Sequence, residues 1–181
     1  MAKYARKTLY MFAVALVIIS VSVSVFAYNY VLNLNPTKSS FTAEELLTAP
    51  EQIEIDNRSY VMDTYLSRDF MPRIVDDLSQ PVHSPIMASI TINSADKQDF
   101  PSSVNTNRLW LIKNQTEVWE IQGAGEKQAP LIDSQLIKVY RNGPEWGTPD
   151  SLLQVDVVIE IIHEGNAYWL KASNQTIWYL M

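Results

Sequence analysis

The feature that most constrains this chain is the uncharged, largely apolar run from Leu9 to Tyr28. About 20 residues with a rise of about 1.5 Å each give a helix of about 30 Å, the thickness of a bilayer core. Lys3, Arg6 and Lys7 precede the run, and basic flanks of this kind stay in the cytoplasm. We therefore expect residues 9–28 to contact the membrane and the rest of the chain to lie outside the cytoplasm.

The same run fits a retained signal anchor or a cleaved signal peptide. The small residues around Phe26 suit signal peptidase, and cleavage near Ala27 would give a secreted or periplasmic protein. However, the run exceeds the usual length of a signal-peptide core, no charge occurs from Thr8 to Thr37, and tyrosines bracket it as in an interfacial belt. We favour the anchor, which predicts a single-pass protein of the cell membrane.

The charge balance of the exported part excludes some classes of partner. Removing Lys3, Arg6 and Lys7 from the 14 basic residues leaves 11 against 20 acidic residues, a net charge near −9. Nucleic acids and anionic lipids both need basic surface, so neither is expected as the main partner. The chain has no cysteine, so stability outside the cytoplasm must come from apolar packing without disulfides.

A stalk and one domain follow the apolar run. The stretch from Asn33 to Ser40 is polar and contains a proline, as in a linker. Thr42 and Glu45 then form a capping box before two leucines, which predicts one short helix that ends before Pro50. We assign residues 1–32 to the signal-anchor helix, 33–50 to the stalk with its short helix, and 51–181 to the extracytoplasmic domain.

From Gln52 onward the pattern is that of β-strands separated by turn residues. Residues 122–130 are rich in glycine and predict a loop, and Asn174 predicts a turn. No long amphipathic helix separates the strands, so we expect an antiparallel β-sandwich of immunoglobulin-like or similar topology. The predicted strands cover residues 53–55, 59–70, 86–93, 108–112, 116–121, 135–141, 153–163, 167–171 and 176–180.

The clearest hairpin joins residues 108–112 to residues 116–121 through Asn114 and Gln115. A loop of two residues would set Trp110 opposite Trp119. A loop of three residues would instead set Lys113 opposite Glu117. The sequence leaves both registers open.

Five short strings carry a resemblance to a known group. They are RDFMP (68–72), NRLWLI (107–112), EVWE (117–120), GPEWG (143–147) and ASNQTIW (172–178). In this order they resemble a group of uncharacterised bacterial exported proteins with a small β-domain. The resemblance spans most of the domain and implies a bacterial, extracytoplasmic protein, but it implies no activity and no site residues.

No motif for a metal, a cofactor or a catalytic nucleophile stands out. His83 and His163 are the only histidines, and without cysteine a zinc site would need two carboxylates. Neither histidine has a recognisable pattern of serine and acid partners, and no G-x-S-x-G elbow occurs. We therefore expect no cofactor, no metal and no enzymatic activity.

The aromatic residues supply the best candidates for binding. Four tryptophans within predicted strands are expected to fill the core, namely Trp110, Trp119, Trp169 and Trp178. Trp146 lies in a turn between Gly143 and Gly147, where burial is harder, so Trp146 and its neighbour Glu145 are candidate contact residues. Asp76 and Asp77 in the long loop 71–85 complete the binding candidates, because loops of that length are often functional.

Two functions from different classes follow from these observations. The first is a non-catalytic, membrane-tethered interaction or accessory domain with a protein partner, as in a subunit of a membrane or envelope complex. The alternative is a secreted carbohydrate or cell-wall binding module that uses exposed aromatic side chains. A planar row of exposed tryptophan and tyrosine would favour the carbohydrate module.

Overall fold

A computed structural model describes residues 39–70, 84–130, 132–149 and 151–181, which belong to a unit that begins at Lys38. The apolar run 9–28 and most of the long loop 71–85 lie outside the described residues. Within the ranges that the structure describes, no helix is both long enough and apolar enough to cross a bilayer.

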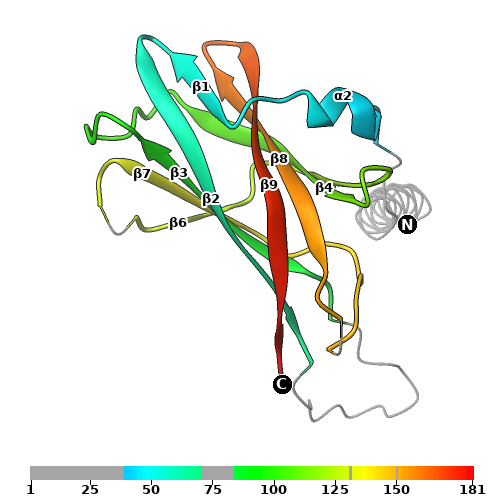
Figure 1. Cartoon of the computed structure of the whole chain (residues 1–181). Coiled ribbons are helices and arrows are strands. Elements are labelled where there is room, and N and C mark those ends of the chain that lie inside the picture. Colours follow the sequence, from blue (N-terminus) through cyan, green and yellow to red (C-terminus); the bar gives the residue numbers. More distant parts are fainter. Residues whose placement is uncertain (1–38, 71–83, 131, 150) are drawn as a thin grey trace, which may run out of the picture. The chain divides into compact units, whose positions relative to one another are not determined.

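The described residues form one short helix and nine strands, so the all-β prediction is confirmed (Figure 1). The predicted loop 122–130 contains one short strand that the sequence pattern missed, β6. The elements are α2 (Ala43–Leu47), β1 (Gln52–Ile55), β2 (Arg58–Asp69), β3 (Met87–Ser94), β4 (Asn105–Lys113), β5 (Glu117–Gln122), β6 (Glu126–Gln128), β7 (Gln135–Tyr140), β8 (Gln154–His163) and β9 (Asn166–Leu180).

These strands form one curled sheet of mixed direction, a half-barrel, and the predicted antiparallel sandwich is corrected accordingly. The strand order is β5-β4-β8-β9-β2-β3-β7-β6, and β1 pairs with β2 beside this path. One pair of strands is parallel. In it, Leu66–Asp69 of β2 pair with Ile177–Leu180 of β9. Figure 1 shows β2 and β9 side by side along this seam. The parallel pair joins the two antiparallel halves into a single sheet.

A bulge at Asn174 lets β9 reach β2. The sequence predicts a turn here, but β9 continues through the position. Val155 of β8 pairs with Gln175, whereas Val157 pairs with Ala172, so β9 carries one extra residue. Asn174 takes a positive φ of 55°, and its N–H donates to Asp156 Oδ1 at 2.8 Å. The left-handed preference of asparagine, which also suits turns, here serves a bulge.

The concave face of the curled sheet holds the main core. Along β3, Ala88, Ile90 and Ile92 point inward and are fully buried, and the intervening residues are only partly buried. They pack in one cluster with Leu109 of β4 and Ile159 of β8, which belong to the other half of the sheet. Because both halves contribute to this cluster, apolar burial holds the curl closed.

Helix α2 covers the convex face of the other half. The predicted capping box is present, since Thr42 Oγ1 accepts from the Glu45 N–H and the Glu45 carboxylate accepts from the Thr42 N–H. Leu46 is fully buried against Trp110 and Val158 in a second apolar cluster. The predicted short helix is therefore confirmed, and it packs directly on strands β4 and β8.

The hairpin between β4 and β5 uses the three-residue loop. Lys113 pairs with Glu117, and Trp110 stands opposite Glu120. Asn114 and Gln115 both take positive φ values, 52° and 60°. The ion pair between Lys113 Nζ and Glu117 Oε2, at 2.8 Å, supports this register across the turn.

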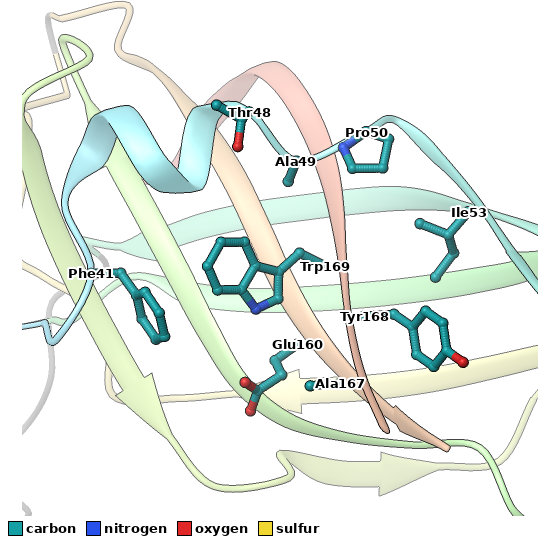
Figure 2. Close-up of a pocket in the computed structure, with 9 residues that line it drawn as sticks. All are labelled: Phe41, Thr48, Ala49, Pro50, Ile53, Glu160, Ala167, Tyr168 and Trp169. Carbon is teal, nitrogen blue, oxygen red and sulfur yellow. The ribbon is translucent and has the colours of Figure 1, made fainter. Parts of the chain in front are cut away.

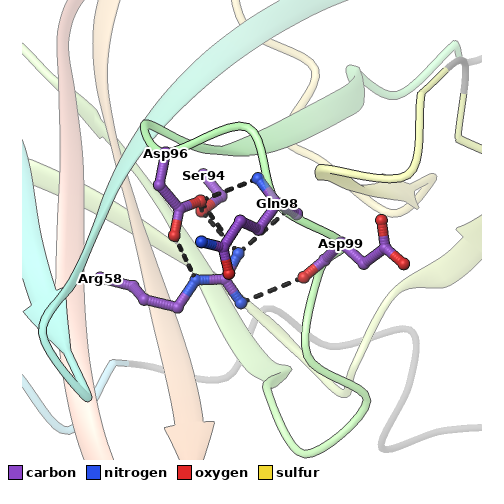
Figure 3. A network of polar contacts seen from close by, with 5 residues as sticks. All are labelled: Arg58, Ser94, Asp96, Gln98 and Asp99. Carbon is purple, nitrogen blue, oxygen red and sulfur yellow. Dashed lines mark hydrogen bonds and ion pairs between the residues drawn. The ribbon is translucent and has the colours of Figure 1, made fainter.

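Arg58 at the start of β2 organises the loop that follows β3 (Figure 3). Its Nε and Nη2 donate to the Asp96 carboxylate at 2.8 and 3.0 Å. The guanidinium also donates to the backbone carbonyls of Gln98 and Asp99. Ser94 Oγ and the Gln98 N–H donate to the same carboxylate. The guanidinium therefore adds two bonds to loop carbonyls beside the backbone bonds that Ala95, Lys97 and Phe100 donate.

Asp96 makes this loop sensitive to acid. Arg58, and then Ser94 and the Gln98 N–H, lower the pKa of the Asp96 carboxyl well below its ordinary value. A lowered folded-state pKa stabilises the fold above the unfolded pKa of about 4, and this stabilisation disappears as the pH falls. We expect Asp96→Asn to lower the urea midpoint at neutral pH and this deficit to shrink below about pH 4. Parallel pH profiles for the two proteins would contradict this assignment.

Candidate functional site

The structure buries Trp146, the leading contact candidate of the sequence analysis. Only 9% of the residue is exposed, and its indole Nε1 donates to Glu117 Oε1 at 2.8 Å. The Lys113 ammonium lies 5.3 Å from the ring centroid. The Lys113 ion pair, and to a smaller extent the Trp146 indole, lowers the pKa of Glu117. The expectation that the Gly-Pro turn would expose this ring is wrong, because the turn folds back over the β4–β5 hairpin.

Arg68 explains how the turn around Trp146 is held. Its guanidinium is buried and donates to the carbonyl oxygens of Glu145, Trp146 and Gly147 at 2.7, 3.2 and 2.7 Å. Its Nε donates to the Ser84 carbonyl at 2.6 Å. The RDFMP and GPEWG strings therefore meet in one network, through Arg68 and Glu145, which are 77 residues apart. This contact indicates a structural role for both strings.

The other binding candidates are placed differently. Glu145 is exposed, and its carboxylate lies 3.9 Å from Arg68 Nη2. Asp76 and Asp77 lie outside the described residues. Of the predicted set, the described residues therefore include only Trp146 and Glu145, which meet on the Arg68 network.

The exposed tryptophan is Trp178, which was expected in the core. Leu66 and Ile177 pair across the parallel seam and both point inward, so their neighbours point outward. On this convex face Trp178 is 57% exposed, Tyr65 is 46% exposed and Leu180 is 38% exposed. Strand membership was predicted correctly for Trp178, but the bulge at Asn174 changes which alternate residues of β9 face the core.

A groove of about 480 Å³ opens on the other convex half, between the segment after α2 and the β8–β9 hairpin (Figure 2). The segment after α2 contributes backbone and side chains from Thr48 to Pro50. Three aromatic rings, two aliphatic side chains and one carboxylate complete the lining: Phe41, Tyr168, Trp169, Ile53, Ala167 and Glu160. Figure 2 shows Glu160 close to Trp169, in line with their cross-strand pairing.

Two buried carboxylates share one guanidinium beside this groove. Arg108 Nε lies 3.1 Å from Glu160 Oε2, and Arg108 Nη1 lies 3.9 Å from Glu120 Oε1. Asn107 Nδ2 donates to Glu160, and the Trp110 indole donates to Glu120 Oε2 at 3.1 Å. Both carboxylates are nearly inaccessible. Arg108 therefore links the two carboxylates, and Asn107 and Trp110 supply each of them with a further donor.

The structure buries two further polar groups, Lys138 and His163. Burial lowers the pKa of Lys138, whose ammonium donates to Asn105 Oδ1 at 2.9 Å. His163 Nε2 lies 2.7 Å from Asp56 Oδ2, which gives this histidine an acid partner 107 residues away in sequence. Its buried Nδ1 has no hydrogen-bond partner among the described residues, so none of the described serines completes a triad.

The remaining comparisons concern metals and known proteins. In the described ranges, no three His, Asp or Glu side chains lie close enough together to hold a metal ion. Comparison of the sequence with protein-family models, with curated proteins and with solved structures yields no match. The function is therefore inferred from the domain's own surfaces.

Proposed function

We propose that this protein is a non-catalytic interaction domain, tethered to the cell membrane by residues 9–28 and exposed outside the cytoplasm. In this role it binds a protein partner, as an accessory subunit of a membrane or envelope complex does. The observation that carries the proposal is the exposed apolar surface formed by Tyr65, Trp178 and Leu180 on the convex side of the β2–β9 seam. We call these three residues the seam patch.

The composition of the seam patch favours a protein partner. It combines two aromatic rings with an aliphatic side chain, and the half-buried Met87 and Val139 lie on the same face of the adjoining strands. Aromatic residues and methionine are enriched at protein interfaces, and the largest exposed apolar patch of a protein is often a functional surface. The acidic balance of the domain fits a protein partner better than nucleic acid or an anionic lipid surface.

Photo-crosslinking in membranes tests the proposal. A full-length protein carrying p-benzoylphenylalanine in place of Tyr65 is expected to form one discrete cross-linked product in bacterial membranes. Adding Trp178→Ser should abolish that product and change the free energy of unfolding by less than about 1 kcal/mol, because the side chain is exposed. Leu152→Ser is the matched control, since Leu152 is 82% exposed and belongs to a different segment.

The outcomes separate the parts of the proposal. A cross-link that persists with Trp178→Ser would exclude the seam patch as the binding surface. Intact mass and membrane fractionation test the anchor, and a soluble product that begins near Tyr28 would contradict tethering.

The second candidate function is the carbohydrate module, and it is supported by the geometry of Tyr65 and Trp178. Tyr65 and Trp178 lie on one face of neighbouring strands and expose their rings. Exposed rings of this kind can stack on sugars. Pull-down with purified peptidoglycan tests this function. Retention that depends on Trp178, without a protein cross-link, would favour the carbohydrate module over the interaction domain.

A further inference from the structure

The concave face of β7 carries a buried cation, Lys138. Alternate residues of β7 point into the core, namely Leu136, Lys138 and Tyr140, and Lys138 is only 4% exposed. Its ammonium donates one hydrogen bond, to Asn105 Oδ1 at the start of β4, at 2.9 Å. An ammonium has further N–H donors, and these have no acceptor among the described residues. A buried charge of this kind needs a partner.

A second cation lies beside Lys138. Lys127 of β6 pairs directly with it, and directly paired residues of antiparallel strands place their side chains on the same face. Burial, and after it the charge of Lys127, lower the pKa of Lys138. Neither lysine forms an ion pair with a carboxylate in the part of the chain that the structure describes. Like charges directly opposite each other destabilise a sheet, so an anion bound by both lysines would remove an unfavourable interaction.

Asn105 adds a neutral donor to the two ammonium groups. Its Oδ1 also accepts from the Thr106 N–H at 2.9 Å, and this bond fixes the side-chain amide. The NH2 group of the same amide makes no hydrogen bond to any described residue. Asn105 and Lys127 are both exposed, and the bond between Lys138 and Asn105 is only part-buried. A small anion can therefore reach the Lys138 ammonium from the solvent side of these two residues.

We propose that Lys127, Lys138 and Asn105 bind a dianionic phosphate group, either as inorganic phosphate or as a phosphate monoester. Two ammonium groups match its charge, and lysine binds phosphate as a point charge, whereas a planar carboxylate suits the fork of arginine. The domain as a whole is acidic, so binding depends on this local pair of lysines. Val139, the neighbour of Lys138, points to the convex face that carries the seam patch. The anion site and the proposed protein contact are therefore on opposite faces and independent of each other.

Urea denaturation of the full-length protein in mild detergent tests the site, with inorganic phosphate as the probe. At about pH 8 phosphate is mainly a dianion. We expect about 50 mM phosphate to raise the folding equilibrium constant about fivefold to tenfold over sodium chloride of equal ionic strength, as a Kd of about 5–10 mM predicts. Glycerol phosphate should act equally if the site takes monoesters, and a response to inorganic phosphate alone would assign the free ion. Acetate should have no effect.

Two lysine variants assign the effect to the site. Lys127→Gln removes one of the two charges at an exposed position and should reduce the effect of phosphate to less than about twofold. Lys97→Gln is the matched control, because Lys97 is also exposed but lies in the loop after β3, and it should leave the effect unchanged. Retention of the full effect in Lys127→Gln, or an equal effect of acetate, would overturn the inference.

The ionisation of Lys138 gives a second readout, which a change in stability alone would not move. NMR of protein that carries isotope-labelled lysine measures the pKa of its amine. Bound phosphate should raise that pKa, and so should Lys127→Gln in the absence of phosphate, because the charge of Lys127 lowers it. A Lys138 pKa that does not respond to phosphate would show that its ammonium is no ligand, and the inference would fail.

Discussion

Replacing Arg68 with leucine is expected to lower the free energy of unfolding by about 3–5 kcal/mol. The guanidinium is buried, and it donates to four backbone carbonyls of two segments that have no ladder pairing there. Without it, the carbonyls of Ser84 and Trp146 lose a buried donor, which costs about 1–3 kcal/mol for each group left unsatisfied, whereas the bonds to Glu145 and Gly147 are only part-buried and contribute less. Urea denaturation of the full-length protein in mild detergent measures the loss.

The same variant should release the turn around Trp146. Arg68→Leu is expected to shift tryptophan emission to longer wavelength, because the Trp146 ring would become exposed. Arg141→Leu is the matched control: its ion pair with Glu126 is exposed on both sides and contributes about 0–1 kcal/mol. Equal destabilisation by the two variants would show that the Arg68 network does not hold the turn.

Local pattern was sufficient to predict most individual elements of the fold. Alternation predicted β3, and the capping box predicted α2, because both signals depend on residues that are neighbours in sequence. The hairpin between β4 and β5 was located correctly, but its register stayed open. The Lys113–Glu117 pair and the Trp110–Glu120 bond agree with the three-residue loop, and only the structure shows both contacts.

The local sequence pattern could not predict how the two halves of the sheet join. The parallel pairing of Leu66 with Ile177 joins residues more than 100 positions apart, and no residue type marks such a pair. Asn174 was assigned to a turn because turns and bulges use the same left-handed backbone. Because of this misassignment, β9 was predicted as two separate strands, and the pairing of its C-terminal part with β2 was not predicted.

The candidate site was predicted less well than the fold, and the two misplaced tryptophans show why. Trp146 lies in a turn but is buried, because Arg68 of β2 donates a hydrogen bond to its carbonyl and holds the turn against the sheet. Trp178 lies in a strand but is exposed, since the bulge at Asn174 decides which alternate residues of β9 face outward. Strand or turn membership therefore did not predict exposure.

The second large effect is expected at Trp110, the fully buried ring beneath α2. Trp110→Ala should lower the free energy of unfolding by about 3–5 kcal/mol through the cavity it leaves. The ring lies edge-to-face with Phe41 at 5.6 Å, contacts Trp169 at 5.9 Å and packs in one cluster with Leu46. Because α2 has only five residues, it depends on this cluster for its stability. Its amides should therefore exchange faster in the variant.

Two further substitutions divide the contribution of Trp110 into packing and hydrogen bonding. Trp110→Phe retains an aromatic ring but removes the indole donor to the buried Glu120 carboxylate, so we expect a smaller loss of about 1–3 kcal/mol. Trp178→Ala removes the same kind of side chain from an exposed position and should change stability by no more than about 0.5 kcal/mol. If Trp110→Ala left amide exchange in α2 unchanged, the helix would be held by contacts other than this ring. The shape of the groove, whose lining includes Phe41 and Trp169, would then not depend on Trp110.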